Sequence, residues 1–248
     1  MGSSTIDDLP LSFRRHLSEE DVKKNSTLQS FDNLERQITI LVDNRDSIDT
    51  ILDIGCGRGS FVAALGDYLQ VERVYGIDVD GEMREFASSK GVETFDVNVE
   101  NQPLPMNDES IDLVLSFGLL EHLRYYDGLF EEVKRVSRDG WFWVATPNLA
   151  SWVNRFALLA GYQPRNVEVS QQRAVGTLPI YKKHKTINHV HAPTYSALLE
   201  LFRTYNFEPV DVVSLTPYQH SRLVTLLDSL FSLRTSWSRR IAVLSRQV

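Results

Sequence analysis

The sequence is poor in cysteine and contains no long apolar run. Cys56 is the single cysteine among 248 residues, so disulfide bonds within the chain are excluded. A lone thiol is typical of a reducing compartment, and we expect a cytoplasmic protein. No apolar stretch approaches the ~20 residues of a membrane-spanning helix, and the polar start MGSSTIDDLP lacks the apolar core of a signal peptide. The sequence therefore predicts a protein without a membrane span.

Basic residues are also scarce, and they are unevenly placed. The chain has 26 Lys and Arg against 33 Asp and Glu, which gives a net charge of −7. The net charge of residues 1–147 is −14, whereas that of residues 148–192 is +5 and that of residues 218–248 is +4. The net negative charge argues against a nucleic-acid partner. The two basic segments favour binding of a small anionic molecule, such as a carboxylate, a phosphate or a sugar-linked group. A solvated basic face is the alternative.

From residue 50 onward, short β-rich runs alternate with helical patterns. Strands are expected at 50–55, 73–79, 92–99, 111–118, 140–147, 209–215 and 239–248. Helices are expected at 28–45, 59–69, 81–91, 126–137, 150–161, 194–206 and 221–233. This alternation predicts the α/β class, with a doubly wound, mostly parallel, Rossmann-like sheet that carries helices on both faces.

The length of the chain predicts a single domain over residues 1–248, as a monomer or a homodimer. Residues 1–48 are expected to form a helical cover over one edge of the core. Residues 148–192 break the strand–helix rhythm, and a long irregular insertion of this kind is typical of a substrate lid. The helical run in 218–233 is expected near the substrate site.

The stretch LDIGCGRGS, residues 52–60, joins the first strand to the next helix, where ligands bind in such sheets. Its glycines allow a ligand to approach the backbone, but a phosphate-binding loop would need a lysine after Gly59, and the dinucleotide fingerprint would need glycine or alanine in place of Ser60. Asp53 would repel a pyrophosphate and favours a cationic ligand instead. Asp78, about 20 residues beyond the loop, ends the second strand, where a carboxylate accepts hydrogen bonds from a ribose. S-adenosylmethionine, a nucleoside with an ammonium and a sulfonium, fits both carboxylates.

Four stretches together resemble the class I S-adenosylmethionine-dependent methyltransferases, in the branch that includes quinone-biosynthesis enzymes. They are LDIGCGRGSF, YGIDVDGEM, PLPMNDESIDLVLSFGLLEHL and GWFWVATPNLASWVNR. The resemblance implies a seven-stranded sheet with an antiparallel last strand. It also implies a cofactor site made of Asp53, Gly55, Cys56, Gly57, Gly59, Asp78, Val79, Met83, Asn98, Val99, Ser116 and Phe117. Asn98 stands where many relatives carry an acidic residue, so Asp96 is the alternative contact to the adenine.

Histidines near the expected site are candidates for proton transfer. A hydroxyl acceptor must lose its proton as the new bond forms, and an imidazole suits that role. His122 lies in GLLEHL after the fourth strand, and NHVHAP contains the other two candidates, His189 and His191. No metal is expected, because the two histidines of NHVHAP have no carboxylate close by in the sequence. The substrate site is expected to include Trp152, Arg155, Phe156, Tyr181, Tyr195 and Tyr218.

The sequence therefore predicts an S-adenosylmethionine-dependent methyltransferase that transfers a methyl group in line to an oxygen of a small, anionic acceptor. An RNA or protein methyltransferase is an alternative, although the chain is acidic and no Asn/Asp-Pro-Pro-Tyr-type motif follows the fourth strand. A non-catalytic module that only binds the cofactor is another.

Overall fold

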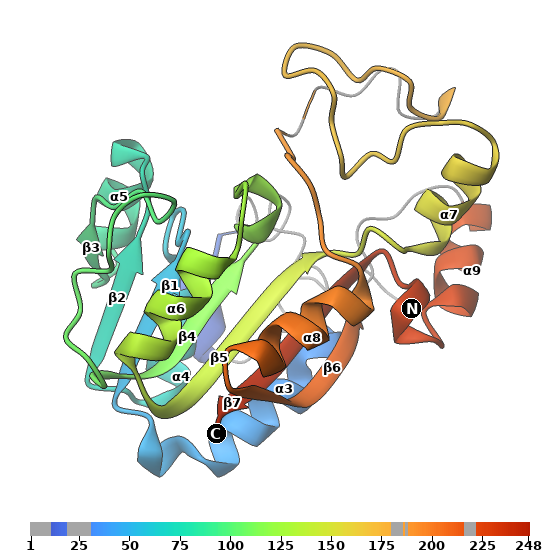
Figure 1. Ribbon diagram of the computed structural model, residues 1–248. Coiled ribbons are helices and arrows are strands. Elements are labelled where there is room, and N and C mark those ends of the chain that lie inside the picture. The colour runs from blue at the N-terminus through green and yellow to red at the C-terminus, as the bar shows by residue number, and fades with distance from the viewer. Residues whose placement is uncertain (1–10, 19–30, 180–185, 187, 216–221) are drawn as a thin grey trace.

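A seven-stranded sheet forms the centre of the protein (Figure 1). The computed structural model describes residues 11–18, 31–179, 186, 188–215 and 222–248. Within these residues the strands are β1 (Thr50–Ile54), β2 (Arg73–Ile77), β3 (Glu93–Phe95), β4 (Ile111–Phe117), β5 (Ser137–Pro147), β6 (Phe207–Leu215) and β7 (Arg240–Gln247). Their order across the sheet is β3-β2-β1-β4-β5-β7-β6, and β7 runs antiparallel to β5 and β6. The expected α/β class, strand number and antiparallel last strand are confirmed.

Helices cover both faces of the sheet, as the alternation predicts. One face packs against α1 (Leu11–His16), α3 (Phe31–Asp43), α4 (Ser60–Leu69) and α5 (Gly81–Ser88). The other packs against α6 (Asp127–Val136) and α8 (Tyr195–Thr204). Successive residues of β4 join opposite cores, because side chains alternate along a strand: Leu113 and Leu115 face the α4 side, and Val114 faces the α6 side.

The strand β3 is shorter than the expected run 92–99. Its pairing with β2 ends at Phe95. Beyond that point the backbone turns: the Asn98 carbonyl accepts hydrogen bonds from the amides of Asn101 and Gln102, at 3.1 and 3.0 Å. The Asn98 side chain also accepts from the amide of Glu100 at 3.0 Å, an arrangement typical of asparagine in turns. The local turn therefore replaces the strand that the residue types alone suggest.

The helix α3 is fixed to the β6–β7 edge of the sheet by a fully buried glutamine. Nε2 of Gln37 donates to the carbonyls of Asp211 and Ala242, each at 3.1 Å. The indole nitrogen of Trp143 donates to Oε1 of the same glutamine at 2.6 Å. All three hydrogen bonds are needed because unpaired polar atoms are costly in a buried interface.

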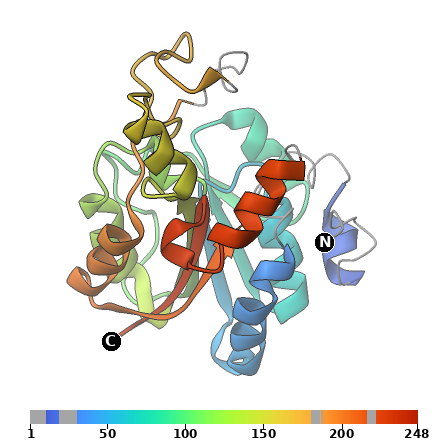
Figure 2. The ribbon, with the colours of Figure 1, turned by 90° about the vertical axis from the view of Figure 1, so that its right-hand side faces the viewer.

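Two further helices, α7 (Trp152–Leu159) and α9 (Arg222–Phe231), lie beside each other at one end of the molecule (Figures 1 and 2). After α7 the described residues 160–178 form no helix or strand, and residues 188–191 lie beside the sheet. There the amide of Val190 donates to the carbonyl of Glu121 at 2.8 Å, in the short helix η4 (Leu120–His122) after β4. Across the described residues, no helix is both long and apolar enough to span a membrane.

Candidate functional site

Three glycines shape the loop between β1 and α4. Gly55, Gly57 and Gly59 have φ angles of 79°, 51° and 66°, a region that other residues rarely adopt. A methyl group on Gly59 would lie 2.6 Å from the Cβ of Ala87 in α5, so this glycine is also required for packing. No atom lies within 4 Å of the Cβ position of Gly57, so the space above it is open to a ligand.

Asp53, the second-last residue of β1, has one carboxylate oxygen without a hydrogen-bond partner among the described residues. The residue is 5% exposed, and its buried Oδ1 accepts no hydrogen bond in the structure. Burial, together with the nearby negative charge of Asp78, raises the pKa of this carboxyl to about 7. A buried acceptor with no donor is rare in a native fold, and it suits a cationic ligand group. The ammonium of S-adenosylmethionine is such a group, so the residues present fit this cofactor.

Asp78, at the end of β2, faces the same loop. One carboxylate oxygen accepts from the amide of Gly57 at 2.8 Å, and the other accepts from the amide of Asp80 at 2.9 Å. The helix α5 is capped by Asp80, whose side chain accepts from two amides of the first turn. Asp78 is therefore not the cap of this helix, and each of its oxygens keeps a lone pair for a ribose hydroxyl.

Both residues considered for the adenine contact have partners. Asp96 forms an ion pair with Arg84 at 3.0 Å, while Asn98 uses its oxygen within the turn described above. The same arginine donates to the carbonyl of Asp78 at 2.8 Å, which joins the ends of β2 and β3. Val79 is 63% exposed beside this edge, an unusual position for an apolar side chain. The roles of Met83, Val99 and these residues in binding the adenine stay predictions.

The remaining candidates for cofactor binding are Cys56 in the loop and Ser116 and Phe117 at the end of β4. Cys56 is 8% exposed, and burial raises the pKa of its thiol, so the side chain is inert packing rather than a nucleophile. Ser116 is fully buried at the end of β4, and its hydroxyl has no hydrogen-bond partner in the structure. The ring of Phe117 packs at 5.1 Å from Phe61 and 5.0 Å from Trp143, measured between centroids. The ring of Phe117 therefore packs in the core, and the roles of Ser116 and Phe117 in cofactor binding stay predictions.

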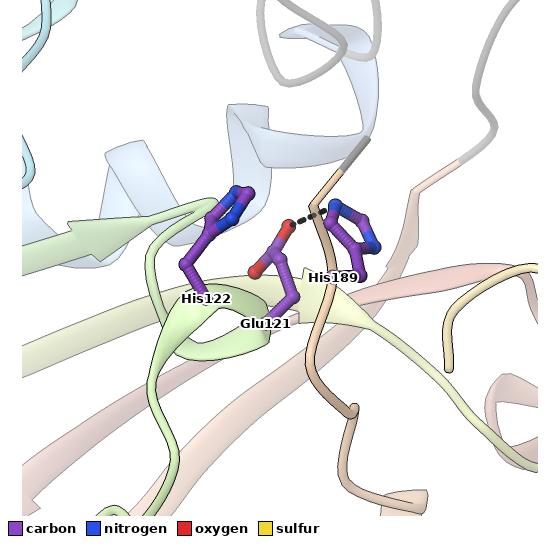
Figure 3. A group of neighbouring side chains, drawn as sticks. All are labelled: Glu121, His122 and His189. Carbon is purple, nitrogen blue, oxygen red and sulfur yellow. Dashed lines mark ion pairs between the residues drawn. The ribbon is translucent and has the colours of Figure 1, made fainter. Parts of the chain in front are cut away.

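Beyond β4, three side chains converge, and we call Glu121, His122 and His189 the Glu–His cluster (Figure 3). One potential metal-ligand atom from each lies within 4.8 Å of the others. Oε1 of Glu121 is 3.8 Å from Nε2 of His189, and the imidazole centroids of His122 and His189 are 5.0 Å apart. Because η4 and β1 end at the same edge of the sheet, the cluster lies on the Asp53 side of the cofactor loop.

Two arginines add positive charge to this region. Nη1 of Arg240, the first residue of β7, is 3.4 Å from Oε1 of Glu121. Burial, together with the smaller effects of the charges of His122, Arg240 and Arg165, lowers the pKa of His189 to about 3. The His189 imidazole is therefore neutral at physiological pH. The potential of the two guanidinium groups favours an anionic partner at this point.

The structure separates His191 from the other two histidines. Its Nε2 lies 2.9 Å from the carbonyl oxygen of Arg124, and its ring stacks on Tyr126 at 4.9 Å. Its other nitrogen lies 3.5 Å from the hydroxyl of the same tyrosine. Both ring nitrogens thus have partners, which distinguishes His191 from the convergent pair.

Three of the expected substrate residues, Trp152, Arg155 and Phe156, lie on α7 and pack against side chains near α9. Trp152 is 8% exposed, donates to Asp228 at 2.8 Å and stacks on Phe231 of α9 at 5.3 Å. Arg155 lies over the ring of Trp237 at 4.7 Å. Phe156 packs beside them, while Tyr195 begins α8. Tyr181, Tyr218 and the lysines at 182, 183 and 185 lie outside the described residues.

Two contributors to the cluster, Arg240 and Thr146, were missed by the sequence analysis. The hydroxyl of Thr146 lies 3.4 Å from Oε2 of Glu121. Both residues stand at strand ends on the ligand-binding edge, but no local motif distinguishes them from other strand residues. Their role depends on the pairing of β5 with β7, which places Pro147 opposite Arg240.

Part of the chain is similar to proteins of known class. Residues 52–144 match a family described as a methyltransferase domain. The chain is 32% identical over 119 residues to a mitochondrial ubiquinone biosynthesis O-methyltransferase of Candida albicans, across 43% of this chain and 36% of that protein. It is 28% identical over 144 residues to a malonyl-[acyl-carrier protein] O-methyltransferase of a Marinomonas strain, across 55% of this chain and 53% of that protein. The chain thus spans about a third to a half of these relatives.

Solved structures share the fold. An S-adenosylmethionine-dependent methyltransferase from Mesorhizobium loti matches with a TM-score of 0.59 and 15% identity, across 91% of this chain and all of that one. A possible histamine N-methyltransferase from Thermotoga maritima matches with a TM-score of 0.53 and 17% identity, across 90% and 98%. Residues 52–144 thus resemble a methyltransferase domain, and the fold is similar to that of solved S-adenosylmethionine-dependent methyltransferases.

Proposed function

We propose that the protein transfers a methyl group from S-adenosylmethionine to an oxygen of a small, anionic acceptor. The observation that carries the cofactor half of this proposal is the unpartnered Oδ1 of buried Asp53 beside the open space over Gly57. Asp53 would hold the ammonium, and Asp78, one strand away, would hold the ribose. When bound, the cofactor supplies a methyl group on a sulfonium, which is a good leaving group.

The acceptor half of the proposal depends on the position of the Glu–His cluster. Asp53 lies on β1 and Asp78 on β2, so the ammonium end of the cofactor is the end nearer to β4. The cluster follows β4 and therefore lies on the side where the acceptor must approach. His122 is exposed, so an acceptor can reach it from solvent, and its imidazole is placed to take up the proton of a hydroxyl. The protein's main contribution is to align the acceptor and exclude water.

The proposed negative charge of the acceptor is supported by the guanidinium groups near the cluster. Arg240 and Arg165 both act on His189 electrostatically. A carboxylate or a phosphate on the acceptor would be attracted to them. The basic balance of residues 148–192 and 218–248 agrees with this preference. The acid-rich first part of the chain disfavours RNA as the substrate.

Two measurements test the proposal. Calorimetry with S-adenosylmethionine and with its demethylated product should show binding that is weakened at least about 10-fold in Asp78→Asn, since a charge-assisted contact is lost. Transfer of labelled methyl groups to a panel of matched acids, phosphates and their neutral esters should favour the anions. Arg165→Gln should then raise KM for the anions and reduce its dependence on salt. Binding without transfer to any acceptor class would instead support a non-catalytic module, and preference for neutral esters would contradict the anionic acceptor.

A further inference from the structure

Glu121 is a buried carboxylate whose contacts are all long. The residue is 2% exposed, yet its contacts to Arg240 and Thr146 are 3.4 Å each and its contact to His189 is 3.8 Å. Charge-assisted hydrogen bonds to carboxylates are normally near 2.7–2.9 Å. A buried carboxylate needs short, well-directed partners to offset its lost hydration. None of the described contacts to the Glu121 side chain meets that need.

The two imidazoles present nitrogen atoms toward the same place. Nδ1 of His122 is 3.1 Å from the carbonyl oxygen of Asn188, and because a carbonyl only accepts, Nδ1 carries the hydrogen. The lone pair of His122 is therefore on Nε2, away from that bond. A backbone carbonyl that fixes the ring in this way is a common partner of metal-binding histidines. Figure 3 shows Nε2 of His189 directed at Glu121, with His122 on the other side of the carboxylate.

We propose that Glu121, His122 and His189 bind a divalent cation of the zinc type at the acceptor side of the cofactor site. Two nitrogens and one carboxylate oxygen are a common ligand set of catalytic zinc, which leaves a further position open to a substrate oxygen. The ligand atoms lie within 4.8 Å of one another, so they must approach by about an ångström to reach zinc–ligand distances of about 2.0–2.2 Å. His122 is exposed, which gives an entry path.

The cation would change how the acceptor loses its proton. A hydroxyl oxygen bound at the open position becomes more acidic, so its proton leaves to solvent rather than to an imidazole. The oxygen then forms its bond to the methyl carbon as the carbon–sulfur bond breaks, and the sulfur leaves as a neutral thioether. This inference rests on the proposed function, because it assigns the cluster to the acceptor of the methyl group.

Cobalt(II) and zinc(II) are suitable probes, since cobalt in a nitrogen–oxygen site gives a visible absorption band. Protein treated with a chelator and then dialysed should bind Co²⁺ with such a band, and Zn²⁺ should displace it. We expect His122→Ala and His189→Ala each to weaken Zn²⁺ binding about 100-fold or more, since even indirect partners of a metal ligand contribute 10–100-fold. His191→Ala is the matched control, and its metal affinity should equal that of the wild type.

His122 is exposed, so His122→Ala should fold even if His189→Ala does not. A Co²⁺ band that is absent in the wild type, or that survives unchanged in His122→Ala, would overturn the metal site. Binding of the demethylated cofactor, measured by calorimetry on the same samples, separates the two proposals. Retained cofactor binding without metal binding rejects only this inference, whereas loss of cofactor binding in the wild type rejects the proposed function.

Discussion

Replacing Asp53 by asparagine should stabilise the cofactor-free protein at neutral and higher pH and weaken cofactor binding. The pKa of this carboxyl is about 7 in the folded protein, compared with 3.8 for an aspartate outside the fold. The folded state therefore binds a proton more tightly, and the stability that this proton provides is lost as the pH rises through 7. Between about pH 5 and pH 7 the free energy of unfolding falls by about 1.36 kcal/mol per pH unit, or by about 3 kcal/mol in total.

Thermal unfolding of both proteins at about pH 5 and about pH 8 isolates this effect, because the amide does not titrate. For a chain of this size, 1 kcal/mol changes Tm by about 2–4 °C, so Asp53→Asn should gain roughly 10 °C on the wild type between the two pH values. Cofactor affinity should fall about 10–100-fold in the variant, because the counter-charge of the ammonium is gone. In the wild type, affinity should rise about tenfold per pH unit up to pH 7 and then level off. A Tm difference that does not change with pH would refute the reasoning about Asp53.

Three further substitutions test the packing that supports the site. Gly59→Ala should destabilise the protein by about 1–3 kcal/mol in urea unfolding, because the residue has a positive φ and the added methyl group would lie 2.6 Å from a side-chain carbon of α5. Unchanged stability would show that the loop can relax. Gln37→Leu should lower the free energy of unfolding by about 2–5 kcal/mol, since the indole of Trp143 and two backbone carbonyls lose their hydrogen-bond partner. A smaller loss of stability would mean that water replaces the amide. Asp228→Ala should cost about 3–5 kcal/mol and change the fluorescence of Trp152, because the indole and the partly buried guanidinium of Arg239 lose this carboxylate. An unchanged emission spectrum would contradict this expectation.

Local sequence signals were sufficient for most of the sheet and for the cofactor loop. The strand β1, the glycines after it and Asp78 are close in sequence, and their residue types carry the pattern that places them. The strand β3 was overestimated because its residue types favour a strand, while the side chain of Asn98 forms a turn with its own backbone. Only the backbone shows that Asp80 caps α5, while Asp78 accepts from the amides of Gly57 and Asp80.

The sequence by itself determined the fold class and the place of the glycine loop after β1, because each depends on periodicity and on residues separated by short distances along the chain. Only the tertiary structure decided what surrounds Glu121. His122 and Asn188 are separated by 66 positions and Glu121 and Arg240 by 119, and they meet because residues 188–191 pair with η4 and β7 pairs with β5. Contacts between such distant segments leave no periodic signal, so the convergence of one carboxylate and two imidazoles depends on packing alone.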